Sequence, residues 1–364
     1  MKQRFLFAVP ISICVAIILV VSGGCAKPSE MPGEMPTEEE TSIPSQPEQQ
    51  VFKWRLQSVH APAEDDMTHA TLEYVNRIRD CSNGRLDITL YAAGELVPTM
   101  DIAVALSERT IEMAWTTGGF YAGAIPEGNL AGCGVPPLIY RSLDEVLYLY
   151  WELGLDELMR EGWAEHGVYY LMTNPCGVGG FWSNDPVYHP EDLKGVKIRG
   201  FGQVLNTFEK LGASPVFIPP DEIYMALSTG VIDAAVSDYI KYDSMKCYEI
   251  SKYIYYPPWL NPAVMDILVS MDAWNELPDD LKAIVKTASV AYALDHTTQC
   301  LWTQREMESH YDEWGTTAIT WSEEDMQKVV EVAWSLAPEL AATSPRCAEG
   351  YRIIEDFMRE RGYL

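Results

Sequence analysis

The chain of 364 residues carries 53 acidic and 26 basic side chains, which gives a formal net charge of −27 at neutral pH. A charge of this size repels nucleic acid and anionic membrane surfaces, so the composition argues against both as partners. A small anionic ligand is still compatible with this negative charge if a nearby cation attracts the ligand. Hydrophobic residues make up 48% of the chain, and the length suggests about two globular domains with a large buried core.

Residues 1–24 have the features of a secretory signal peptide. Lys2 and Arg4 precede an apolar run over residues 5–21, and small residues follow before Cys25. The sequence Val21-Ser-Gly-Gly-Cys25 resembles a lipobox, which would make Cys25 the lipidated first residue of the mature protein, although Ser22 replaces the usual aliphatic residue. An uncleaved membrane anchor is the alternative, and both place the rest of the chain outside the cytoplasmic membrane. Residues 25–50 are rich in Pro, Glu, Ser and Thr and predict a disordered tether.

Residues 51–174 predict the first of two α/β lobes. Apolar periodicity indicates strands over 52–59, 86–91 and 111–115, separated by helices over 64–80 and 99–107. Ligands of parallel sheets gather at the carboxyl ends of the strands, where this lobe would present His60, Tyr91 and the run from Trp115 to Tyr121. A helix over 143–161 and a strand over 168–172 would lead into the second lobe.

The second lobe is expected over residues 175–262. It opens with Cys176-Gly-Val-Gly-Gly-Phe-Trp182, whose glycines allow close backbone approach, but no Lys-Ser/Thr pair follows as in a phosphate-binding loop. Beyond it, strands predicted over 196–199, 215–218 and 231–236 alternate with helices over 204–211 and 221–228. This alternation is typical of a parallel sheet covered by helices.

Arg199 stands at the end of the first of these strands. A guanidinium there suits a carboxylate, which it can hold with two parallel hydrogen bonds. A surface arginine is the alternative, and the position alone does not decide between them.

The remaining elements connect the lobes. A strand over 264–270 would return to the first lobe, so the chain would cross between lobes more than once and form a hinge of adjacent strands. A long helix over 281–311 would brace both lobes. We therefore assign about 263–300 to the first lobe and expect the helices of 300–364 to pack mainly on the second.

Six cysteines remain once Cys14 and Cys25 are set aside: Cys81, Cys133, Cys176, Cys247, Cys300 and Cys347. An exported protein can form disulfides, and these cysteines permit about 15 pairings that the sequence does not choose between. Buried free thiols are the alternative, because a core this large needs no covalent staples.

Four segments together resemble one family. They read SNGRLDITLYAAGEL at 82–96, LKGVKIR at 193–199, LGASPV at 211–216 and EIYMALSTGVIDAA at 222–235. In this order and spacing the chain resembles the extracytoplasmic solute-binding proteins of tripartite ATP-independent periplasmic (TRAP) transporters, the DctP family. The resemblance implies an α/β, two-lobed periplasmic-binding-protein-like fold with a ligand cleft between the lobes and a long helix bracing both. It also implies that Arg199 grips a ligand carboxylate.

The resemblance places further ligand positions at His60, Thr117, Phe120, Gly179, Gly202 and Ser237. Most of these residues are small or apolar here, which favours a small or apolar acid. Five aromatic residues would then sandwich a hydrophobic or aromatic carboxylate, with core packing as the alternative for each: Trp115, Phe181, Trp182, Tyr239 and Trp259.

Residues 253–259 resemble the branch of the family that binds 2-oxo acids together with a cation. That branch has a Glu-Trp pair and a glutamine where this chain has Val236-Ser237 and Gly177, so two metal ligands are absent. Asp238 and the carbonyl oxygen of Asn261 are the substitutes if a calcium or sodium ion is bound. A solvated or helix-capping Asp238 is the alternative, and no cofactor is required.

These observations predict an extracytoplasmic receptor that captures an organic acid anion, a small or aromatic monocarboxylate or a 2-oxo acid, for the small and large TRAP permease proteins. We expect no enzyme activity, because the sequence contains no Gly-x-Ser-x-Gly elbow and no His-Glu-x-x-His helix. The alternatives are an exported sensor lipoprotein with the same binding fold and an exported α/β hydrolase or lyase.

Overall fold

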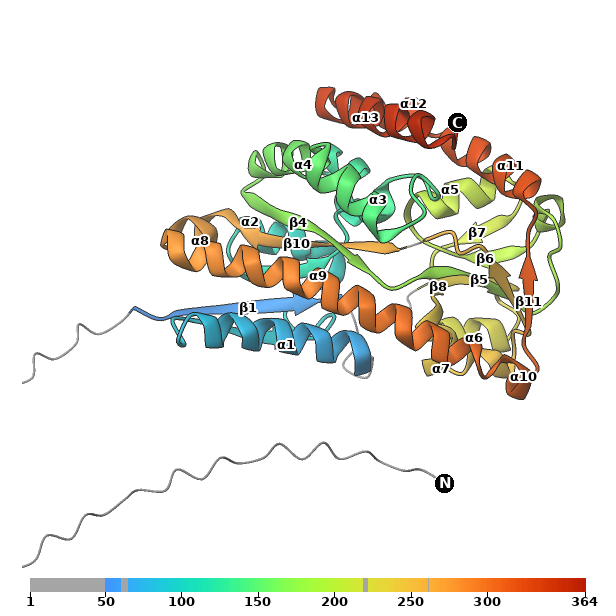
Figure 1. Ribbon diagram of the computed structural model, residues 1–364, viewed down its shortest axis with the longest axis horizontal. Coiled ribbons are helices and arrows are strands. Elements are labelled where there is room, and N and C mark those ends of the chain that lie inside the picture. The colour runs from blue at the N-terminus through green and yellow to red at the C-terminus, as the bar shows by residue number, and fades with distance from the viewer. Residues whose placement is uncertain (1–49, 60–64, 219–221, 261) are drawn as a thin grey trace, which may run out of the picture. The chain divides into compact units, whose positions relative to one another are not determined.

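The computed structural model describes residues 50–59, 65–218, 222–260 and 262–364, without the side chains of residues 65–69. The predictions for the signal peptide, the tether, Cys25, His60 and Asn261 lie outside the described residues. The residues from Gln49 onward form one compact unit. It is built on two sheets, and the helices that cover them define a first and a second lobe (Figure 1).

The first lobe surrounds a five-stranded sheet in the order β2-β1-β3-β10-β4. In this sheet β1 runs parallel to β2 and β3, whereas β10 runs antiparallel to β3 and β4. Alternating apolar residues bury one sheet face against α1 and α9 and the other against α2 and α4. The strands are β1 (Phe52–Ser58), β2 (Leu86–Tyr91), β3 (Met113–Thr116), β4 (Val168–Cys176) and β10 (Ala263–Ser270), and the helices are α1 (Asp65–Cys81), α2 (Ile102–Ser107), α3 (Leu143–Leu147), α4 (Leu155–Ala164) and α8 (Met271–Glu276).

The second lobe surrounds a six-stranded sheet in the order β11-β9-β5-β8-β6-β7. Helices α5 and α11 cover one face, and α6 and α7 cover the other. The strands are β5 (Gly179–Ser183), β6 (Lys197–Arg199), β7 (Ser214–Val216), β8 (Ala234–Asp238), β9 (Tyr253–Tyr256) and β11 (Thr317–Thr320), and the helices are α5 (Gly202–Lys210), α6 (Ile223–Ser228), α7 (Tyr239–Ser244), α10 (Tyr311–Trp314) and α11 (Glu323–Trp334).

Two chain segments cross between the sheets and pair with each other. The backbone N–H of Gly179 donates to the carbonyl oxygen of Leu260 at 2.8 Å, and the N–H of Leu260 donates back at 2.9 Å. The N–H of Ala263 donates to the carbonyl oxygen of Gly177 at 3.0 Å. The expected hinge of adjacent strands is therefore present.

Helix α9 (Asp279–Glu308) has 30 residues and packs on α1 and β4 in the first lobe and on α7 in the second, as the long-helix prediction required (Figure 1). None of the described helices is both long and apolar enough to cross a bilayer. No disulfide joins the described cysteines, so the alternative without disulfides is the one that the structure supports.

The helical spacing of apolar residues over 143–161 is confirmed, but the stretch is not one continuous helix. It divides into α3, a π-helical turn over Tyr148–Glu152, and α4. Gly154 separates the last two with φ of 92°, a backbone conformation that glycine adopts without steric cost.

The last helix, α13 (Pro345–Arg361), also differs from expectation. It packs on α4 and on the 3-10 turn Pro126–Leu130, which belong to the first lobe, whereas α11 packs on the second; the short α12 (Ala337–Ala341) lies between them. Arg346 forms ion pairs with Glu127, with Glu161 of α4 and with Glu165, which follows α4, and the hydroxyl of Tyr351 donates to the carbonyl oxygen of Asn129 at 3.1 Å. These polar contacts were not visible in the helical periodicity.

Candidate functional site

The candidate site lies where the carboxyl ends of β6 and β8 approach the crossing segments and the turns that follow β3. Gly202, the first residue of α5, packs directly on Cys133 in the 3-10 turn Gly132–Gly134 of the first lobe. Gly177, in the first crossing, lies beside Asp238 of β8 and Cys300 of α9. Elements of both lobes and the long helix therefore meet here.

Arg199 ends β6 with its side chain only 2% exposed. Its Nε donates to the carbonyl oxygen of Ile218 at 2.8 Å, and its Nη1 donates to that of Val236 at 2.6 Å. Burial lowers the pKa of Arg199 to about 10, and the negative charge of Asp238 opposes this shift. Arg199 thus stays charged at neutral pH, and within the described residues it has no ion-paired carboxylate.

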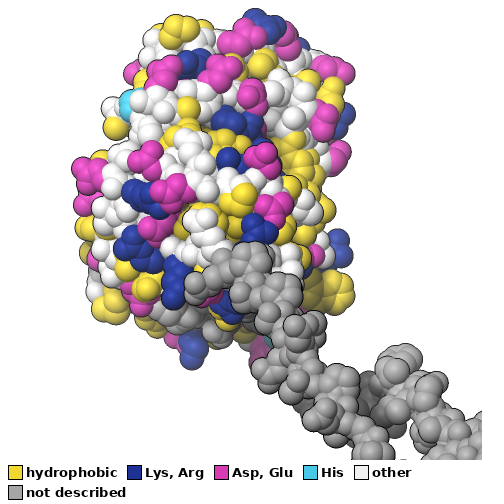
Figure 2. Space-filling model, turned by 90° about the vertical axis from the view of Figure 1, so that its left-hand side faces the viewer, with side chains coloured by type: hydrophobic (Ala, Val, Ile, Leu, Met, Phe, Trp, Pro, Cys, Tyr) yellow, Lys and Arg dark blue, Asp and Glu magenta, His cyan; other side chains and the backbone are white. Residues whose placement is uncertain are grey.

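Most other arginines differ from Arg199 in having carboxylate partners. Arg85 pairs with Asp280 and Arg109 pairs with Glu276, and both ion pairs lie at the surface. Figure 2 shows acidic and basic side chains interspersed over one face of the molecule. A buried guanidinium held by backbone carbonyls is therefore unusual in this chain, and it leaves a charge to be neutralised by something else.

Phe201 is a neighbour of Arg199 that the sequence reasoning missed. Its half-buried ring lies 5.3 Å from the guanidinium carbon of Arg199, within the range of a cation–π contact. The only sequence signal for it was its place two residues after the arginine.

Asp238 ends β8 and precedes α7. It is half-buried, and although it occupies the N-cap position of α7, its side chain makes no capping hydrogen bond. No hydrogen bond or ion pair of its carboxylate occurs within the described residues. The helix-capping alternative for Asp238 is therefore wrong.

Three other predicted site residues are found near the lobe junction. Ser237 is buried in β8, opposite Gly180. Thr117 Oγ1 accepts a hydrogen bond from the N–H of Cys133 at 3.1 Å, so this hydroxyl holds a turn of the first lobe. Phe120 is half-buried and meets Tyr121 edge-on.

The five aromatic candidates do not form a sandwich, because they belong to three separate core clusters. Trp115 lies with α1 and α9, Phe181 and Trp259 lie with α5 and α11, and Trp182 and Tyr239 lie with α6 and α7. All five are at most 2% exposed. Successive residues of β5 point to opposite faces of the sheet, which separates Phe181 from Trp182. Core packing, the alternative for each, is what the structure shows.

The family model that describes bacterial extracellular solute-binding proteins, family 7, matches residues 58–343. The chain belongs to this family. A monocarboxylate 2-oxoacid-binding periplasmic protein of Nostoc sp. is 30% identical over 78% of this chain and 78% of its own length. The protein is thus an extracytoplasmic solute-binding protein of the TRAP type, as the sequence predicted.

Two solved structures of TRAP solute-binding proteins share the fold. One, from Bordetella bronchiseptica, has a TM-score of 0.76 and 21% identity, with 86% of this chain and 93% of that chain covered, and it contains calcium and picolinate. The other, from Colwellia psychrerythraea, has a TM-score of 0.75 and 24% identity, with 85% and 95% covered, and it binds calcium and pyruvate.

The described residues of this solute-binding protein fit a calcium ion poorly. Calcium takes six to eight oxygen ligands, whereas the side chains nearest to the position of an added Cβ at Gly177 include the carboxylate of Asp238 and the thiol of Cys300. Cys176 adds a second buried thiol close to both. No group of three or more His, Cys, Asp or Glu side chains suited to a metal occurs within the described ranges.

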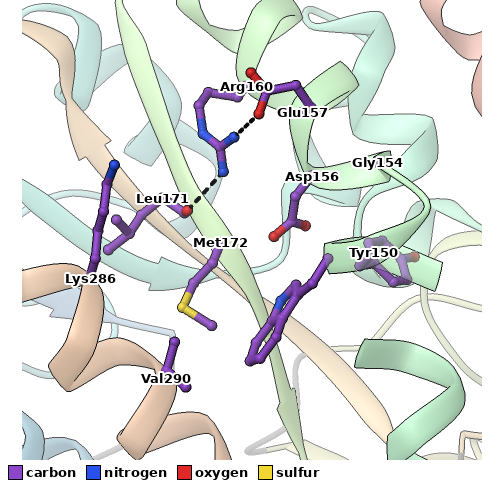
Figure 3. Close-up of a pocket in the computed structure, with 10 residues that line it drawn as sticks. Tyr150, Gly154, Asp156, Glu157, Arg160, Leu171, Met172, Lys286 and Val290 are labelled. Atoms are coloured by element: carbon purple, nitrogen blue, oxygen red, sulfur yellow. Dashed lines mark hydrogen bonds and ion pairs between the residues drawn. The ribbon is translucent and has the colours of Figure 1, made fainter. Parts of the chain in front are cut away.

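A pocket of about 220 Å³ lies elsewhere, between α4, β4 and α9 (Figure 3). Two cations line it. Arg160 is half-buried, pairs with Glu157 and donates to the carbonyl oxygens of Tyr170 and Leu171 at 3.2 and 3.3 Å, whereas Lys286 is exposed and lies over the ring of Trp274. Neither is a fully buried cation like Arg199 at the lobe junction.

Proposed function

We propose that this protein captures a small organic carboxylate, and that Arg199 holds the carboxylate group. The observation that carries the proposal is the burial of a charged guanidinium at a strand end, without an ion-paired carboxylate among the described residues. Leaving such a cation uncompensated costs free energy. A ligand carboxylate would supply the counter-charge through short, charge-assisted hydrogen bonds.

The ligand class we favour is a small or aromatic monocarboxylate or 2-oxo acid. The name of the Nostoc relative supports this choice. Besides Arg199, we propose Ser237 and Asp238 from the second lobe, and Thr117 and Phe120 from the first, as residues that line the site. His60 and Asn261 belong to the proposal as well, on the sequence alone.

Capture would proceed by closure of the two lobes around the paired crossing segments. A ligand that contacts both lobes favours the closed form, because only that form offers both sets of contacts. We assign the close contact between Gly202 of the second lobe and Cys133 of the first lobe to this closed form. Closure removes water from the carboxylate and strengthens its interaction with Arg199.

Delivery completes the proposed function. The loaded receptor would dock on the small and large TRAP permease proteins and release its ligand unchanged, so it is a receptor and no enzyme. Lipidation of Cys25, with residues 25–50 as tether, would hold it at the membrane surface. Capture needs no metal in this proposal, because Arg199 supplies the charge; a calcium or sodium ion at Asp238 would need oxygens from the ligand and from Asn261.

The test is calorimetric titration of wild-type and Arg199 variants with a panel of carboxylates, after refolding to strip carried-over ligand. Arg199→Ala and Arg199→Lys should both abolish or strongly weaken binding, since lysine cannot form the two-pronged contact. Lys197→Ala is the matched control, because Lys197 lies on the same strand but is exposed and pairs with Asp233. Unchanged affinity in folded Arg199→Lys protein would refute Arg199 as the anchor.

A further inference from the structure

Resting on the proposed function, we infer that Asp266 is a positioning residue for ligand capture, and that it acts through a buried hydrogen-bond relay that holds one proton between Asp266 and Asp156. Asp266 lies in the middle of β10, paired in register with Thr116 of β3 and with Thr173 of β4. Strand β3 leads into Thr117, which we place in the site, and β4 leads into the first crossing between the lobes. Asp266 therefore lies between the two strands that enter the lobe junction.

Oδ2 of Asp266 contacts two turns at the lobe junction. It accepts a hydrogen bond from the N–H of Gly118, the residue after Thr117, at 2.6 Å. It also lies against the second turn, because a Cβ at Gly132 would stand 3.2 Å from it. This second turn includes Cys133, whose N–H donates to Thr117 and whose carbonyl oxygen approaches the second lobe. The carboxyl of Asp266 therefore supports both a proposed ligand contact and the contact between the lobes.

Oδ1 of Asp266 begins the relay. It contacts the hydroxyl of Tyr170, which lies 2.9 Å from Oγ1 of Thr173. Oγ1 of Thr173 lies 2.6 Å from Oδ1 of Asp156, in α4. Asp266 is fully buried and Asp156 is 6% exposed. Neither carboxyl has an ion pair in the described part of the chain, so the relay joins two buried acids without a cation between them.

The hydrogen bonds of the relay require an additional proton. Its three contacts between oxygen atoms need three protons, and its two hydroxyl groups supply only two. If both carboxyls were ionised, two oxygen atoms would meet in the core without a proton between them, which is costly. One proton on Asp156 lets both hydroxyls donate towards Asp266, and one on Asp266 lets both donate towards Asp156. A single proton on either carboxyl therefore satisfies all the contacts.

The pKa values support this proton count. Burial raises the pKa of both carboxyls to about 7. The surrounding groups keep their charge state near that pH, because Arg160 is ion-paired with Glu157 and burial raises the pKa of each neighbouring tyrosine and thiol. These neighbours are Tyr121, Cys133, Tyr140, Tyr150, Tyr170 and Cys176. The relay should therefore lose its proton as the pH rises through about 7.

Loss of this proton should weaken the binding of an anionic ligand. Both ends of the relay then carry a negative charge, including the end beside the turn of Thr117, and charges repel strongly where water is excluded. The ligand anion thus prefers the protonated relay, so its affinity is highest below about pH 7 and falls as the pH rises above it. Arg199, with a pKa of about 10, and the ligand carboxylate keep their charges over this range.

The experiment is calorimetric titration of the best carboxylate of the panel between pH 6 and 8.5. Wild-type affinity should fall at least about fivefold over this range. Asparagine imitates protonated Asp266, because its oxygen accepts from Gly118 and its NH₂ group donates to Tyr170 at every pH. Asp266→Asn should therefore keep the wild-type affinity of pH 6 and lose the pH dependence. Asp243→Asn is the matched control: it replaces a half-buried carboxyl of α7 in the second lobe and should behave as wild type.

Infrared difference spectroscopy tests the proton without any ligand. The C=O band of protonated carboxyl groups in the wild-type protein should lose intensity between pH 6 and 8.5. Asp266→Asn should reduce this change by more than Asp243→Asn does. The wild-type spectrum decides whether the proton is present even if Asp266→Asn fails to fold.

Three results would overturn the inference alone, provided that binding still depends on Arg199. The first is a wild-type affinity that does not change with pH. The second is a pH profile that folded Asp266→Asn retains, which would assign the titration to another group such as His60. The third is a wild-type infrared band that does not change. Binding of no carboxylate at any pH would instead reject the proposed function and this inference together, so the two failures are distinguishable.

Discussion

A side chain on Gly202 would overlap the carbonyl oxygen of Cys133. Gly202 begins α5 in the second lobe, and Cys133 lies in a turn of the first lobe. Gly202 also has φ of 52°, in the left-handed region where other residues are strained. This residue therefore combines a backbone requirement with a requirement for close contact between the lobes.

We predict that Gly202→Ala weakens ligand binding without unfolding the protein. The added methyl group must separate α5 from the turn at Cys133, and overpacking of this kind costs about 1–3 kcal/mol. If the cost falls on the closed form alone, the apparent affinity drops roughly 5- to 150-fold. Calorimetric titration with the best carboxylate of the panel measures the change.

The matched control is Gly230→Ala. Gly230 has φ of 70° but nothing near the position of an added Cβ, so the variant carries the backbone strain without the contact between lobes. It should lose some stability and keep its affinity. Equal affinities in the Gly202 and Gly230 variants would contradict the assignment of this contact to the closed form.

Two buried carboxyls make stability depend on pH. Burial raises the pKa of both Asp266 and Asp156 to about 7. Hydrogen bonds from Tyr170 and Gly118 to Asp266, and from Thr173 to Asp156, lower these pKa values but do not offset the effect of burial. Both values lie above that of an unfolded aspartate, near 3.9. Between about pH 4 and pH 7 the folded state therefore binds more protons than the unfolded state.

We predict that the contribution of these two carboxyls to the free energy of unfolding is largest below about pH 4 and falls as the pH rises towards 7. Urea unfolding between pH 4.5 and 8 measures the slope. Asp266→Asn should flatten it, because asparagine has no proton to release. A wild-type slope of zero, or the same slope in the variant, would show that these carboxyls do not titrate as described.

Local pattern was enough to predict the strands of the first lobe and the position of Arg199, but β5, β9 and β11 of the second lobe were not predicted. The strand over 86–91 has the predicted limits, and Arg199 ends β6 because the alternation of strands and helices was clear in the sequence. The approach of Gly202 to Cys133 was not predictable, since it depends on how two lobes meet. The faces taken by Phe181 and Trp182 likewise depend on which helices cover each side of the sheet.

The described thiols should differ sharply in reactivity. Cys81 is exposed, whereas burial raises the pKa of Cys133 and of Cys247 to about 12 and also raises that of Cys176 well above its usual value. Because the thiolate is the reactive form, we predict that Cys81 reacts quickly with a disulfide reagent and that the buried thiols react only on unfolding. Cys81→Ser should remove one equivalent of the fast phase. A melting temperature that falls on adding reductant would contradict the absence of disulfides among these residues.

Ser344 connects the last helix to the first lobe. Its Oγ accepts a hydrogen bond from the N–H of Cys347 at 3.0 Å, which caps α13, and donates to Oε1 of Glu127 at 2.8 Å. Glu127 is only 3% exposed. Ser344→Ala removes the cap, worth about 1 kcal/mol, and takes one partner from a buried carboxylate. We therefore predict a loss of about 1–3 kcal/mol in the free energy of unfolding, measured by urea denaturation.

Ser142→Ala is the control for this prediction. Ser142 precedes α3, but its hydroxyl donates to Asp144 and makes no capping bond to the backbone, so its replacement should change stability by less than about 0.5 kcal/mol. Arg346, which also contacts Glu127, remains in the Ser344 variant and keeps the carboxylate paired. The double variant Ser344→Ala with Arg346→Ala should therefore lose more free energy of unfolding than the two single variants lose together. Strict additivity of the two changes would show that Glu127 does not couple them.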